Sequence, residues 1–98
     1  MNEDVDNAVV EFTNYAAKIY SWVFNQFRNS IRNIKRGEAE NVFKMQLSKY
    51  SSELKKHLEQ QVKLLADSHP ATYKEIESVL SEKINYYLQA FWQKGVAL

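Results

Sequence analysis

Residues 43–65 read FKMQLSKYSSELKKHLEQQVKLL, and the spacing of their apolar side chains decides the fold class. The apolar positions recur at intervals of three and four residues, which is the period of a helix that buries one face. They are Phe43, Leu47, Tyr50, Leu54, Leu58, Val62 and Leu65. Charged and amide side chains occupy most of the other positions. The stretch therefore predicts a helix that packs in a bundle through one narrow seam.

Helix-breaking residues on either side of this stretch divide the chain into three helices. The chain holds two glycines and one proline, and Gly37 and Pro70 flank the central helix. Glycine ends helices because it adopts the left-handed conformation at low cost, and proline lacks the N–H that a helix interior needs. We expect helices at about residues 4–36, 38–67 and 70–94.

Capping residues refine the ends of these helices. Asp4 is a suitable N-cap for the first helix. The third helix begins either after a Ser68 cap or at Thr72, whose partner Glu75 completes a capping box. Gly95 predicts that the third helix frays near its end.

The similar lengths and short connections of the three helices favour an all-α fold, an antiparallel up-down-up three-helix bundle in which residues 1–98 form one domain. Ninety-eight residues, 45% of them apolar, are enough for one hydrophobic core but not for a two-domain enzyme. The alternative is one uninterrupted helix through Gly37, because a single glycine costs only about 1 kcal/mol in a helix interior.

Aromatic side chains concentrate in the first and third helices, where they widen the apolar seam on both sides. A chain of this size buries only about 60–65% of the surface that its unfolded form exposes, so we expect both broad faces to keep aromatic surface for a partner. The expected partner-interface residues are Tyr15, Tyr20, Trp22, Phe24, Tyr86 and Trp92. The sequence thus predicts a protein–protein interaction or oligomerisation module that binds itself, as a homodimer, or another helical protein. The alternative is a monomer whose aromatics fill a wide core.

A basic stretch near the end of the first helix supports an alternative function. Asparagines alternate with cations over residues 25–36. Arginine offers paired donors to phosphate and guanine, and asparagine can pair with adenine, so the stretch is a candidate nucleic-acid contact. The candidate residues are Arg28, Arg32, Lys35 and Arg36. The net charge of the chain is only +1, which favours a second interpretation, a solvated helix end stabilised by the helix dipole.

Residue types that carry catalysis or bind cofactors are not grouped in this sequence. The chain has no cysteine for a thiolate nucleophile or a zinc site, and its two glycines cannot form a phosphate-binding loop. His57 and His69 lie on different elements, and neither has a metal-binding residue four positions on. We therefore expect no enzymatic activity, no metal and no cofactor, while an apolar ligand between the aromatic faces stays open.

The N-terminal residues and the short apolar runs bear on location. The chain begins with acidic and polar residues rather than the basic start of a signal peptide, and no apolar run approaches the ~20 residues of a membrane span. We expect a cytoplasmic protein. Peripheral membrane binding through the aromatic face of the first helix is a third alternative, which the asparagine-rich polar side of that helix disfavours.

Overall fold

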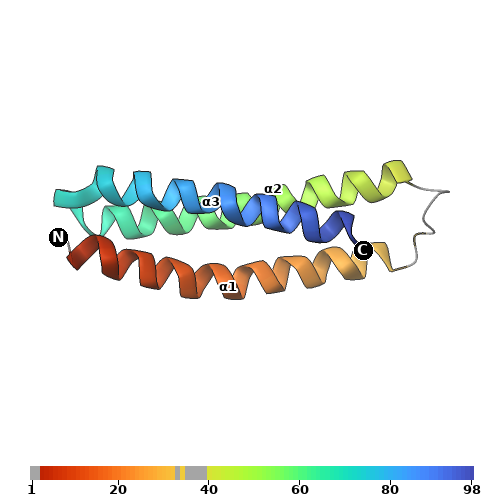
Figure 1. The fold of residues 1–98 in the computed structure, drawn as a ribbon, viewed down its shortest axis with the longest axis horizontal. Coiled ribbons are helices and arrows are strands. Elements are labelled where there is room, and N and C mark those ends of the chain that lie inside the picture. The colour runs from red at the N-terminus through yellow and green to blue at the C-terminus, as the bar shows by residue number, and fades with distance from the viewer. Residues whose placement is uncertain (1–2, 33, 35–39) are drawn as a thin grey trace.

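The computed structural model describes residues 3–32, 34 and 40–98, and its regular elements in this part of the chain are all helical (Figure 1). They are α1 (Glu3–Ile31), α2 (Glu40–Asp67), the short 3-10 turn η1 (Pro70–Thr72) and α3 (Tyr73–Val96). α2 runs antiparallel to α1 and α3, and all three helices pack against one another. The predicted all-helical, up-down-up three-helix bundle is confirmed, and the alternative of one uninterrupted helix is wrong.

The bundle is a rod rather than a sphere. Its extents are 53 × 18 × 18 Å and its Cα radius of gyration is 15.7 Å, whereas a compact domain of about 100 residues has a radius near 13 Å. The long helices cause this shape, because 24 to 29 residues at about 1.5 Å per residue span most of the rod. The antiparallel course places the start of α1, the end of α2 and the start of α3 at one end of the rod (Figure 1).

The first helix ends earlier than predicted. α1 stops at Ile31 instead of residue 36, and the backbone N–H of Ile34 donates to the carbonyl of Ile31 at 3.0 Å. This three-residue spacing tightens the chain after the last helical turn and satisfies a carbonyl that the helix leaves open. Gly37, the predicted helix breaker, lies outside the described residues. Asp4 lies inside the first turn rather than at the cap, because α1 already includes Glu3.

The connection between α2 and α3 uses neither of the two predicted caps. The Ser68 hydroxyl donates back to the carbonyl of Leu64 at 2.9 Å, and Thr72 makes no side-chain capping bond to α3. Instead Pro70 opens η1, where its fixed φ suits a first turn and its missing N–H costs nothing. α3 then continues to Val96, two residues beyond the predicted end at residue 94.

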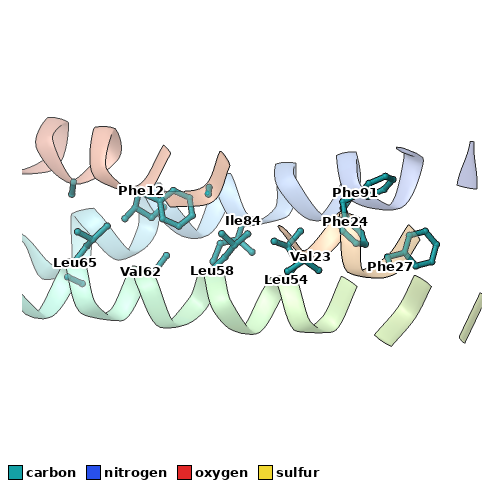
Figure 2. Packing of buried hydrophobic residues seen from close by; sticks show 14 of the residues in the cluster. Phe12, Val23, Phe24, Phe27, Leu54, Leu58, Val62, Leu65, Ile84 and Phe91 are labelled. Carbon is teal, nitrogen blue, oxygen red and sulfur yellow. The ribbon is translucent and has the colours of Figure 1, made fainter. Parts of the chain in front are cut away.

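The core is one continuous apolar cluster along the axis between the helices (Figure 2). α2 contributes the narrow seam that its sequence predicts. Its buried members are Phe43, Leu47, Leu54, Leu58, Val62 and Leu65, while Tyr50 is half-buried. No polar or charged side chain is buried among the described residues. Apolar burial is therefore the main contribution that holds the three helices together.

Aromatic rings fill the space between α1 and α3. Phe91 of α3 lies 5.4 Å from Phe24 and 5.7 Å from Tyr20, both edge to face, and Tyr87 meets Phe12 at 6.2 Å. The two broad aromatic faces thus largely cover each other. The expectation that one chain cannot hide both is wrong for these rings, because each helix of a three-helix bundle contacts two neighbours and needs a wide apolar face.

Candidate interaction surface

The six predicted partner-interface residues divide into buried and exposed sets. Phe24 is only 3% exposed within the core, so the prediction that it anchors a partner is contradicted. Tyr20 is half-buried, stacks with Phe24 and packs edge to face on Phe91, so most of its ring serves the monomer. These two residues are part of the α1–α3 contact, as the alternative of a wide core predicted for them.

The exposed aromatics do not share one surface. Tyr86 is 70% exposed and Trp92 is 40% exposed, but they stand six residues apart on α3, which separates them by about 120° around the helix. Trp22 of α1 is 52% exposed and contacts α2 instead of α3. The structure therefore places Trp22 on the α2 side of α1, whereas Tyr20 packs against α3.

Apolar and aromatic side chains gather between α1 and α2, with the exposed Lys18 and Glu53 among them. The Trp22 ring meets the His57 ring edge to face at 6.0 Å and 82°, which joins the two helices at this level. Residues seven positions apart lie on the same helix face, so Tyr15 shares the side of Trp22, and Tyr50 and Leu64 share the side of His57. We call this set the α1–α2 face: Tyr15, Trp22, Tyr50, His57 and Leu64.

The register of the α1–α2 face follows from its one ring contact. Because α1 and α2 are antiparallel, the residue seven positions before Trp22 and the residue seven positions after His57 lie at the same height along the rod. Tyr15 therefore lies level with Leu64, whose side chain is 63% exposed. Tyr15, Tyr50 and His57 are half-buried. The sequence analysis missed Leu64 and His57 as surface partners of Trp22, although their seven-residue spacing was a usable signal.

The basic stretch of α1 lines a shallow hollow at the other candidate site. Asn25, Arg28, Asn29 and Arg32 border it together with Ile31 and Leu98, and its volume is about 610 Å³. Both arginines are exposed, and an Arg32 guanidinium N–H donates to the side-chain oxygen of Asn29 at 3.4 Å. Lys35 and Arg36, the other two candidate nucleic-acid contacts, lie outside the described residues.

Charge is strongly segregated along the rod. The end that contains residues 3–11 and 64–79 carries seven carboxylates and one lysine. The opposite end, built from residues 24–32, 40–51 and 92–98, carries five cations and one carboxylate. The net charge of +1 conceals this polarity, because the two ends nearly cancel. We refer to them as the acidic end and the basic end.

Two tyrosines have perturbed pKa values. Burial raises the pKa of the Tyr20 phenol, and the charge of Tyr86 raises it further. The charge of Glu77 is the largest cause of the raised pKa of Tyr73, with smaller contributions from burial, from Asp67 and from a hydrogen bond to Glu77. Both phenols therefore stay protonated near neutral pH, and their effects are confined to alkaline solution.

Metal-binding and membrane-spanning features are not found in the part of the chain that the structure describes. No group of three or more histidine and carboxylate side chains there could hold a metal ion. None of the helices in those residues is long and apolar enough to cross a membrane. No known protein family, characterised protein or solved structure matches this chain.

Proposed function

We propose that the protein is a non-enzymatic helical interaction module that binds a protein partner through the α1–α2 face. The observation that carries the proposal is Trp22, a large aromatic side chain that stays half-exposed and is not part of the buried core cluster. Exposed apolar side chains that cluster on a surface mark interaction sites, and tryptophan contributes more than most residues to binding energy. Leu64, exposed on the neighbouring helix, extends the same surface.

The proposal is tested by a photo-crosslinking amino acid placed at position 22 in the native host cell. Gln89, an exposed position on α3, is the matched control site. We expect a discrete covalent adduct from position 22, no adduct from position 89, and loss of the adduct when Leu64→Ser removes the neighbouring apolar side chain. Equal labelling from both positions, or no adduct from position 22, would overturn the proposed surface.

The hollow lined by Asn25, Arg28, Asn29 and Arg32 supports a second candidate function, the binding of nucleic acid at the basic end. Binding through phosphate contacts weakens steeply with salt. Fluorescence anisotropy of a labelled 20-base-pair duplex at 50 mM salt would measure it. The double variant Arg28→Ala/Arg32→Ala should reduce the salt slope by about 2, and absence of binding at low salt would rule this function out.

A further inference from the structure

We infer that the partner on the α1–α2 face is a second copy of this chain, which lies antiparallel to the first with its acidic end beside the basic end of the other. The inference rests on the proposed function, because it uses the same surface. The charge polarity of the rod supports it, because the two ends are complementary only when the copies are antiparallel.

Charge polarity selects the orientation of the two copies. Seven carboxylates and one lysine lie at one end of the rod, and five cations and one carboxylate lie at the other. A parallel pair would place like ends together, whereas an antiparallel pair places each acidic end against a basic end. Complementary charge steers association and suppresses the wrong orientation.

Part of this charge borders the α1–α2 face directly. At the basic end, the Lys49 ammonium lies 5.3 Å from the ring centre of Tyr50. Arg32 donates a hydrogen bond to Asn29, and Asn29 lies seven residues beyond Trp22 on the same side of α1. At the acidic end, Glu11 precedes Tyr15 by four residues and Asp67 follows Leu64 by three, so each is a neighbour on its helix surface. The face thus runs from a carboxylate border to a cationic border.

The apolar residues set the register of the two copies. Opposing each Trp22 to Tyr15 of the other copy puts the two-fold axis halfway between these residues, at Lys18–Ile19, with Leu64 beside each Tyr15. Opposing the cationic border to the carboxylate border, Arg32 to Glu11, puts the axis near residues 21–22, about 4–5 Å further along α1. The charges therefore determine the orientation of the pair, and the rings determine its register.

The arrangement is a closed pair. Both copies use the same face, so the contact is isologous and no equivalent surface is left to add a third copy. End-to-end pairing of the same charges would instead produce open filaments. The proposed assembly is therefore a dimer of about twice 11.5 kDa, a mass that light scattering distinguishes from a filament.

Charge reversal on exposed residues tests the orientation without disturbing the core. The basic-border variant is Arg32→Glu/Lys49→Glu, and the acidic-border variant is Glu11→Lys/Asp67→Lys; all four side chains are exposed. In an antiparallel pair each variant alone has like charges at both borders, so we expect at least tenfold weaker dimerisation than wild type. A 1:1 mixture of the variants restores opposite charges at both borders, and we expect a heterodimer at least as tight as the wild-type dimer.

A distance between spin labels gives an independent readout. The chain has no cysteine, so Met45→Cys, at a position 69% exposed on α2, gives a single labelling site. The inferred axis meets α2 halfway between His57 and Leu64, about 23 Å from position 45 along the helix. Labels in an antiparallel pair should stand at least about 46 Å apart. In a parallel pair the labels are level along the rod, so only the width of the pair separates them and the distance is shorter.

These experiments separate failure of the inference from failure of the proposed function. A monomeric wild type, undiminished dimerisation of the charge-reversed variants, no recovery on mixing, or a label distance below about 46 Å each overturns the antiparallel pair. A position-22 adduct of different mass from two copies of the chain leaves the interaction surface intact and refutes the second copy as its partner. The absence of any adduct from position 22 would overturn both the proposed interaction surface and the second copy as its partner.

Discussion

Replacing Gly95 by alanine tests the closest approach between helices in the bundle. Gly95 is buried in the last turn of α3, and a Cβ atom there would run into Cδ1 of Leu47 and touch Cε2 of Phe27 at 3.4 Å. Leu47 and Phe27 are almost fully buried, so neither can swing into solvent. Overpacking costs about 1–3 kcal/mol, while alanine gains up to about 1 kcal/mol over glycine in a helix. We expect Gly95→Ala to lower the free energy of unfolding by about 0–2 kcal/mol, the difference between these two contributions.

Urea unfolding followed by circular dichroism at one fixed protein concentration measures this change. Gln93→Ala, at an exposed position in the same turn, is the matched control and should stay within about 0.5 kcal/mol of wild type. In a Leu47→Ala background the space opens, so Gly95→Ala should become neutral or stabilising, with a coupling of about 1 kcal/mol or more. A gain in stability from Gly95→Ala in the wild-type chain would refute the close packing of α3 on α1 and α2.

Three further predictions concern the core, the alkaline limit and the surface. Phe91→Ala should lower the free energy of unfolding by about 3–5 kcal/mol, because its ring is fully buried. Tyr86→Ala should lower it by less than about 1 kcal/mol, because its ring is 70% exposed. Equal losses in urea unfolding would contradict the burial of these two rings. Because the pKa of Tyr20 is raised in the folded state, its contribution to stability is complete below pH 10 and is lost as the pH rises through the folded-state pKa. Tyr20→Phe should therefore flatten the fall in the free energy of unfolding above pH 10. An unchanged dependence of the free energy on pH would contradict the raised pKa. Glu40→Gln breaks the 3.8 Å ion pair with Lys44, in which both side chains are about two-thirds exposed. Thermal unfolding should therefore show a loss of less than about 0.5 kcal/mol in the free energy of unfolding. A much larger loss would be inconsistent with this exposure.

The seam of α2 was predictable almost residue by residue. Six of the seven apolar positions named from the sequence are buried, and Tyr50 is half-buried. The prediction succeeds because a helix with one apolar stripe has only one way to bury it. Pro70 likewise marked the connection to α3, since a proline fits a first turn and disrupts a helix interior.

The aromatic faces of α1 and α3 were harder to interpret from sequence. Their breadth was correctly recognised, but Phe24 was assigned to a partner, whereas it packs on Phe91 inside the monomer. Periodicity shows that a side chain lies on an apolar face, yet the same signal arises whether a neighbouring helix or another protein covers it. Trp22 lies at a different angle around α1 from Phe24, and that angle leaves it half-exposed beside α2.

The sequence by itself determined that this protein consists of three long helices, where the connection at Pro70 falls, and which stripe of α2 is buried. These are local properties, because propensity, helix period and breaking residues act within a few turns. Only the tertiary structure decided which rings keep exposed surface and how charge is distributed, since both depend on residues far apart in the chain. The antiparallel course of α2 gathers the carboxylates of α1 and α3 at one end and cations from all three helices at the other, and so converts a nearly neutral chain into a rod with opposite ends.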